Sequence, residues 1–134
     1  MNYKYLYIII LILLFDAIWI GTNIKMYSDS VREIQGSEMI VRYHFVIVAY
    51  IVVVLTTLFI TIPFAGYHID KKADLSERLL NSFIYGGGTG FAIYAIYNLT
   101  CLSIYHKYDV YVAIKDTLWG TFLNTIITFI YYII

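Results

Sequence analysis

Apolar residues fill four long stretches of the chain, and short polar segments separate them. A helix needs about 20 predominantly apolar residues to cross the hydrocarbon core of a bilayer. Four segments reach that length, at residues 5–24, 43–64, 79–104 and 111–131. The pattern therefore predicts an all-α fold, an integral membrane four-helix bundle with both termini on the same side. Residues 1–134 would form a single transmembrane domain.

The amino-acid composition supports a membrane protein and gives no support to nucleic acid as a partner. The chain is 61% hydrophobic and 13% charged, whereas a soluble domain is usually about half apolar and about a quarter charged. Nine Lys and Arg balance nine Asp and Glu, so no charge excess favours nucleic-acid binding, and the lipid bilayer is the expected partner. The basic residues divide four against five between the two sides of the predicted bundle. The positive-inside rule therefore favours neither orientation, and the sequence does not select a membrane.

The connecting segments carry helix start and stop signals. Ser30 and Glu33 have capping-box spacing and Gly36 is a stop signal, so residues 31–35 are predicted to form a separate short helix. Pro63 is predicted to end the second segment, because proline interrupts a helix. Asp74 is predicted to cap the start of the third helix.

Tyrosines gather near the segment ends, among them Tyr27 and Tyr108. Aromatic residues at these depths are typical of an interfacial belt. We interpret these tyrosines as membrane anchors and not as part of a binding site.

Two aspartates interrupt the apolar segments, in "DAIWIG" (16–21) and "DTLWG" (116–120). At about 1.5 Å per residue, Asp16 and Asp116 lie in the same half of the bilayer, only about 5 to 6 Å apart in depth. Trp19 and Trp119 each follow an aspartate by three residues, which places Asp and Trp on one helix face. An intramembrane carboxylate costs at least about 2.5 kcal/mol and usually marks a site. Because burial disfavours the charged form, we expect the two aspartates to share a proton or to be neutral.

The third and fourth segments add polar and small residues at steps of three and four, which place them on one stripe of each helix. Gly86 and Gly90 have the small-xxx-small spacing that allows close helix packing. The residues assigned to one intramembrane ligand-binding or polar site are Asp16, Trp19, Tyr94, Tyr97, Asn98, Thr100, Asp116, Trp119 and Asn124.

No catalytic residue, cofactor or metal site is predicted. The three histidines lie at segment ends or in loops without metal-ligand spacing, and the single cysteine, Cys101, has no partner for an internal disulfide. "GGGTG" (86–90) lacks the spacing and the lysine of a phosphate-binding loop.

The motifs "DAIWIG", "YNLT" (97–100) and "DTLWG" resemble those of an uncharacterised family of small four-span predicted membrane proteins, mostly bacterial. That family typically has Asp-x-x-Trp-x-Gly, Tyr-Asp-Leu-Thr-Asn and Asp-x-x-Trp-Gly in its first, third and fourth helices. Asn98 stands where the family usually has Asp, and Cys101 where it usually has Asn, so the site here would have one carboxylate fewer. The resemblance implies the fold and the place of the site, but no activity. Residue usage is typical of an AT-rich genome, and a viral member would fit it.

Three functions remain open at this stage. The favoured one is a protein that binds or transports a small ligand, an ion, a proton or a lipid headgroup. An intramembrane lipid-modifying enzyme would use the two aspartates as acid and base. A purely structural membrane protein, either alone or as a homo-oligomer, would use the polar residues as interhelical glue.

Overall fold

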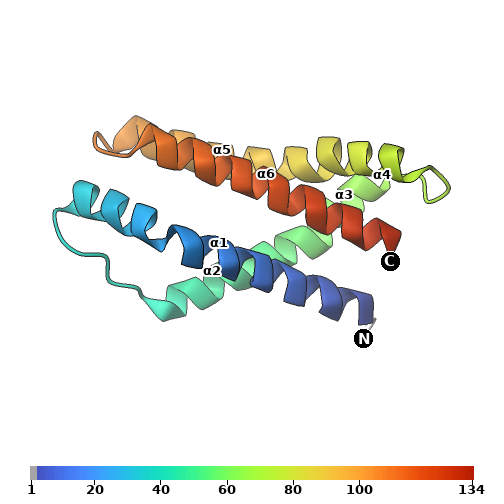
Figure 1. Cartoon of the computed structure of the whole chain (residues 1–134), viewed down its shortest axis with the longest axis horizontal. Helices are drawn as coiled ribbons and strands as arrows, with labels where there is room; N and C mark the ends of the chain where they lie inside the picture. Colours follow the sequence, from blue (N-terminus) through green and yellow to red (C-terminus); the bar gives the residue numbers. More distant parts are fainter. Residues whose placement is uncertain (1–2) are drawn as a thin grey trace.

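The computed structural model describes residues 3–134, and that range contains helices and no strand. The helical pieces join end to end into four rods (Figure 1). The rods are α1 (Tyr3–Gln35); α2 (Tyr43–Thr56), η1 (Thr57–Thr61) and α3 (Ile62–Gly66); α4 (Leu75–Asn81), η2 (Ser82–Gly87) and α5 (Gly88–Ile104); and α6 (Val110–Ile133). The predicted all-α class is confirmed.

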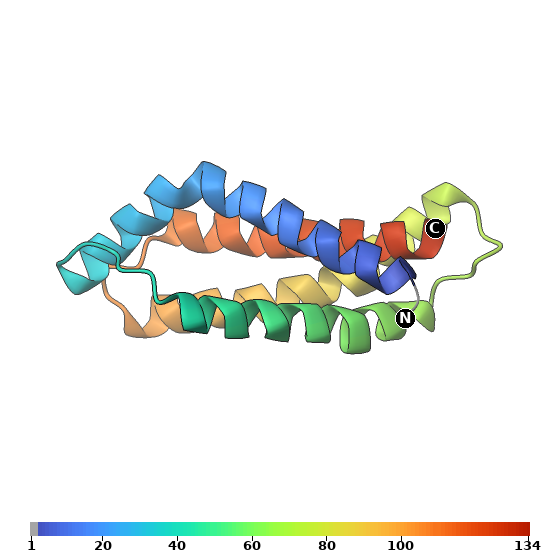
Figure 2. The ribbon, with the colours of Figure 1, turned by 90° about the horizontal axis from the view of Figure 1, so that it is seen from below.

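The rods lie lengthwise beside one another, and both termini lie at the same end (Figures 1 and 2). The loops that follow α1 and α5 lie at the opposite end. The closest packing joins α6 to α5 and η2, and α1 packs along α6. Two rods, Tyr3–Gln35 and Tyr43–Gly66, are long and apolar enough to cross a membrane by length and composition.

The first rod is longer than its apolar segment. It continues without a break to Gln35, so the prediction of a separate short helix at residues 31–35 was wrong. Extending an existing helix costs less than nucleating a new one, and no proline or glycine intervenes. The helix ends at Gly36, as predicted, where a φ of 72° and a hydrogen bond from its N–H to the Arg32 carbonyl close the last turn.

The second rod does not end at Pro63, contrary to the prediction. Its helix continues to Gly66, and a wider π-helical turn at Thr57–Thr61 comes directly before the proline. Proline lacks an N–H and clashes with the carbonyl four residues earlier, so it is tolerated where the turn is already widened. The predicted cap of the third rod is confirmed, since Asp74 accepts a hydrogen bond from the Glu77 N–H at 2.8 Å.

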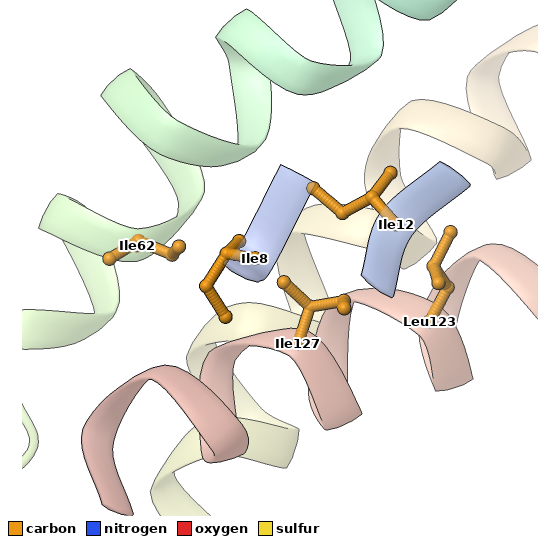
Figure 3. Packing of buried hydrophobic residues seen from close by; sticks show 5 residues of the cluster. All are labelled: Ile8, Ile12, Ile62, Leu123 and Ile127. Carbon is orange, nitrogen blue, oxygen red and sulfur yellow. The ribbon is translucent and has the colours of Figure 1, made fainter. Parts of the chain in front are cut away.

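A compact apolar core holds three rods together in the half of the molecule near the termini. Its buried members come from α1, α3 and α6 and are Ile8, Ile12, Ile62, Leu123 and Ile127 (Figure 3). On α1 and α6 they recur at steps of four, and the next step along each helix reaches Asp16 and Trp119. The core therefore sets the register that brings the polar residues of α1 and α6 together.

Glycines allow the third and fourth rods to approach closely, as predicted. A Cβ atom on Gly90 would meet the Gly120 carbonyl oxygen and the Asn124 side chain, and one on Gly86 would meet Thr128. The rods touch here through backbone atoms, so this contact fixes the position of α5 against α6.

Candidate functional site

The two Asp-x-x-Trp motifs meet at a stacked pair of indoles. The rings of Trp19 and Trp119 are parallel to within 1°, with centroids 4.6 Å apart. Trp119 Nε1 donates to Asp16 Oδ1 at 2.8 Å. Trp19 Nε1 donates to the Tyr27 hydroxyl at 2.8 Å, and that hydroxyl donates to Asp116 Oδ1 at 2.8 Å. Each indole therefore points toward the aspartate of the other helix, because the helices are antiparallel.

The second oxygen of Asp116 is held by α5. Asn98 Nδ2 donates to Asp116 Oδ2 at 2.8 Å and to the Tyr94 carbonyl at 2.9 Å. Asn98 Oδ1 accepts a hydrogen bond from the Tyr108 hydroxyl at 2.6 Å. Since Asn98 is only 1% exposed, both ends of its amide are satisfied by protein groups, as a buried amide requires.

The two aspartates accept hydrogen bonds from different donors. Asp16 accepts a hydrogen bond from Trp119, whereas Asp116 accepts hydrogen bonds from Tyr27 and Asn98. The stacked indoles connect the two aspartates, since Trp119 donates to Asp16 and Trp19 reaches Asp116 through the Tyr27 hydroxyl. The expectation that the two aspartates share a proton or are neutral stays a prediction.

Two tyrosines interpreted as anchors belong to the site. The Tyr27 hydroxyl donates to Asp116 Oδ1, and the Tyr108 hydroxyl donates to Asn98 Oδ1. Burial raises the pKa of Tyr108, with Tyr97 and Asp116 adding to the shift. Both phenols act as hydrogen-bond donors. Their positions along the chain could have identified them. Tyr27 follows Asp16 and Tyr108 follows Asn98, each toward the end of the molecule that holds the α5–α6 loop (Figure 1).

The other predicted site residues divide into two sets. Tyr94 packs its ring where a Gly120 Cβ would lie, and its carbonyl holds Asn98. Thr100 is exposed and stays outside the network. Asn124 is buried but donates to Gly120 O on its own helix at 2.9 Å, so it serves packing. The network brings together six of the nine predicted residues, namely Asp16, Trp19, Tyr94, Asn98, Asp116 and Trp119.

No cation neutralises Asp116 within the described chain. Lys115 is its sequence neighbour, but Lys115 Nζ donates to Asn23 Oδ1 at 2.6 Å and lies 5.5 Å from the centroid of the Trp19 ring. Among residues 3–134 the ion pair present is Lys25 with Asp29, at 2.6 Å. Asp116 is therefore held by neutral donors.

A cavity of about 490 Å³ lies between α1, α5 and α6 and reaches Asp116. A second cavity of about 440 Å³ lies toward the loop after α5 and shares Ser30, Tyr108 and Val112 with the first. The first is lined by Tyr27, Ser30, Val31, Ile34, Gln35, Tyr97, Cys101, Tyr105, Tyr108, Val112 and Asp116. The remaining predicted residue, Tyr97, thus lines the cavity beside Asp116. We call the two cavities together the Asp116 cleft.

Comparison with known proteins places the chain in a family. The model of the family described as predicted membrane protein (DUF2177) matches residues 1–133. The chain belongs to this family. It is therefore a membrane protein, and the resemblance seen in its three motifs is confirmed. No curated protein and no solved structure matches the chain.

The family's three motifs form one structure in this chain. The motifs of the first and fourth rods supply the stacked indoles and the two aspartates, and the motif of the third rod supplies Asn98. Aspartate at position 98 would lack the N–H donors that the Asn98 amide gives to Asp116 and to Tyr94. The asparagine therefore supplies the donor that Asp116 Oδ2 accepts at this contact.

Proposed function

We propose that this is a multi-pass membrane protein, with all four rods crossing the bilayer as a bundle, that binds a small polar ligand in the Asp116 cleft. The observation that carries the proposal is a carboxylate held by neutral donors at the inner wall of a cavity. Ligand sites are typically concave, with a few polar groups placed among apolar and aromatic side chains.

The hydrogen bonds prepare Asp116 to accept further contacts. Each of its oxygens accepts one bond from a neutral donor, Tyr27 or Asn98. A carboxylate has about four acceptor positions, so positions remain for a ligand. A ligand that bonds there offsets part of the cost of burying the charge.

The position of the cleft favours binding over passage through the molecule. The apolar core of Ile8, Ile12, Ile62, Leu123 and Ile127 lies in the half of the bundle near the termini (Figure 1). A polar ligand that moved past Asp16 toward the termini would have to cross this closely packed layer. The cleft is therefore proposed as a binding site reached from the end that holds the α5–α6 loop.

The enzyme and the structural alternatives make different predictions about the cleft. Acid–base catalysis by the two aspartates needs both carboxyl groups at the substrate, yet Asp116 lines the cavity and Asp16 does not. A purely structural role predicts a sealed polar cluster. The cavity beside Asp116 supports the binding function over both.

The single cysteine provides a direct test of the cleft. Cys101 lines the cavity and is 7% exposed. We expect a small water-soluble thiol reagent, methyl methanethiosulfonate, to label Cys101 in the folded, detergent-purified protein faster than global unfolding allows. Val31→Trp, which adds an indole to the cavity wall, is expected to slow labelling at least about tenfold, because occluding a pocket removes reagent access. Mass spectrometry measures the labelled fraction with time.

Ile24→Trp is the matched control, because Ile24 is on the same helix, is 46% exposed and does not line the cleft. Its labelling rate should equal that of the unmodified chain. Labelling that occurs only at the unfolding rate in every variant would show that the cleft is closed, and the proposal would fail.

A further inference from the structure

We infer that the Asp116 cleft binds an organic ammonium ion, of the kind carried by amino-alcohol compounds such as choline, either free or as a lipid headgroup. The inference rests on the proposed function and names its ligand class. It follows from three features of the cleft: its charge, its aromatic lining and an unpartnered hydroxyl.

The charge of the cleft is negative. The cavity that reaches Asp116 is lined by that carboxylate and by no lysine, arginine or histidine. The adjoining cavity adds Glu33 and Asp109 against Lys107, with His106 beside them, and Asp29, whose carboxylate is paired with Lys25. Carboxylates that line a low-dielectric cleft raise the local concentration of cations, so the mouth would attract a cation and the inner wall would pair with it.

The aromatic lining favours an organic cation over a bare metal ion. Four tyrosines line the inner cavity, Tyr27, Tyr97, Tyr105 and Tyr108. Aromatic rings attract ammonium groups through their quadrupole, and cages of such rings recognise quaternary ammonium ligands. The Tyr27 and Tyr108 hydroxyl hydrogens are already donated to Asp116 and Asn98. These two residues therefore offer ring surface and lone pairs to a ligand, which suits a cation.

A buried hydroxyl at the junction of the two cavities lacks a partner. Ser30 is 7% exposed and lines both cavities, and its Oγ has no hydrogen-bond partner among residues 3–134. A buried polar group without a partner costs about 1–3 kcal/mol. A ligand that carries an oxygen a few atoms from its ammonium group would accept a hydrogen bond from Ser30 while the ammonium group meets Asp116.

The depth of the cleft also fits such a ligand. Tyr27, Ser30 and Tyr108 lie outside the predicted membrane segments, whereas Tyr97 and Asp116 lie inside them. The cleft would then cross the boundary between headgroups and hydrocarbon. Its inner volume of about 490 Å³ falls within the range of about 300–1,000 Å³ that is typical of small-molecule sites.

The test uses the full chain in phosphatidylglycerol nanodiscs and measures Cys101 labelling by methyl methanethiosulfonate. Choline chloride at about ten times its Kd is expected to slow labelling about tenfold, since the fraction of free sites falls in that proportion. Sodium chloride at equal ionic strength and 3,3-dimethylbutan-1-ol, the uncharged isostere of choline, should leave the rate unchanged. A second series in phosphatidylcholine nanodiscs asks whether the lipid headgroup itself protects Cys101.

Two variants test the assigned contacts. Asp116→Asn should abolish protection by choline, and Tyr105→Leu should weaken it several-fold. Tyr105 is 44% exposed, so its replacement should not unfold the protein. Tyr111→Leu is the control for it, because Tyr111 is also exposed and lies outside the cavity lining.

The outcomes separate the ligand class from the cleft itself. Protection by choline or by phosphatidylcholine, with loss in Asp116→Asn, supports the inference, and the two lipid series distinguish free amine from lipid. Equal protection by 3,3-dimethylbutan-1-ol, or no protection while Cys101 still labels in the folded protein, would overturn the ammonium assignment and leave the cleft intact. A Cys101 that never labels in the folded state would overturn the proposed function instead.

Discussion

Gly90→Ala is expected to destabilise the protein by about 1–3 kcal/mol or to prevent folding, which is the range for overpacking a close contact. The added methyl group would meet the Gly120 carbonyl oxygen and the Asn124 side chain, at 2.7 Å from Asn124 Nδ2. Backbone atoms cannot rotate away, so α5 must shift from α6. Unfolding of the detergent-solubilised protein by a denaturing detergent, followed by circular dichroism, measures the change.

Gly88→Ala is the matched control for this prediction. Gly88 is two residues away on the same helix, and nothing lies within 4 Å of the Cβ it would gain. Alanine is preferred to glycine in a helix by about 1 kcal/mol, so this variant should be neutral or slightly more stable. Equal destabilisation by the two substitutions would show that α5 and α6 do not meet at Gly90.

Asn98→Asp is expected to destabilise the protein by about 1–3 kcal/mol at neutral pH, the cost of leaving buried groups unsatisfied. The change replaces the donor that holds Asp116 Oδ2 and the Tyr94 carbonyl with a second carboxyl group. A proton shared between the two carboxyl groups would restore one bond. The folded variant then binds a proton that the unfolded chain releases, so its stability falls as pH rises.

The double substitution Asn98→Asp with Asp116→Asn tests whether that effect is specific. It keeps one carboxyl group and one amide at the contact, with the donor and the acceptor exchanged. We expect it to recover much of the lost stability and to remove the added pH dependence, measured by thermal unfolding across pH. Failure of the exchange to recover any stability would mean that Asn98 and Asp116 do not interact directly.

Much of the architecture follows from hydrophobic pattern and local signals. Segment length predicts four helical rods, Asp74 marks the start of the third, and Gly36 marks the end of the first. Pro63 shows the limit of local rules, because the rod continues past it to Gly66 after a π-helical turn. A residue-by-residue signal such as proline does not predict whether a widened turn will let the helix continue.

The sequence predicts which polar residues lie close together, but not which of them form hydrogen bonds with each other. The spacing of Asp16 with Trp19 and of Asp116 with Trp119 predicts shared faces, and the structure confirms that these residues meet. Which indole bonds to which aspartate depends on how the two antiparallel helices are aligned. Residue spacing within one helix does not give that alignment. Tyr27 was missed because a tyrosine at a membrane boundary has the same sequence signature whether it anchors the helix or bonds a buried carboxylate.

The hydrogen bond from Tyr27 to Asp116 joins α1 to α6 at the inner wall of the cleft, on which the proposed binding site depends. A double-mutant cycle with Tyr27→Phe and Asp116→Asn, read by denaturing-detergent unfolding, measures their coupling free energy. We predict a coupling of about 0.6 to 1.7 kcal/mol, the range for interhelical hydrogen bonds in membranes. A parallel cycle with Tyr7→Phe, on the exposed face of the same helix, should show none. Additivity of Tyr27→Phe and Asp116→Asn within about 0.3 kcal/mol would contradict the proposed site.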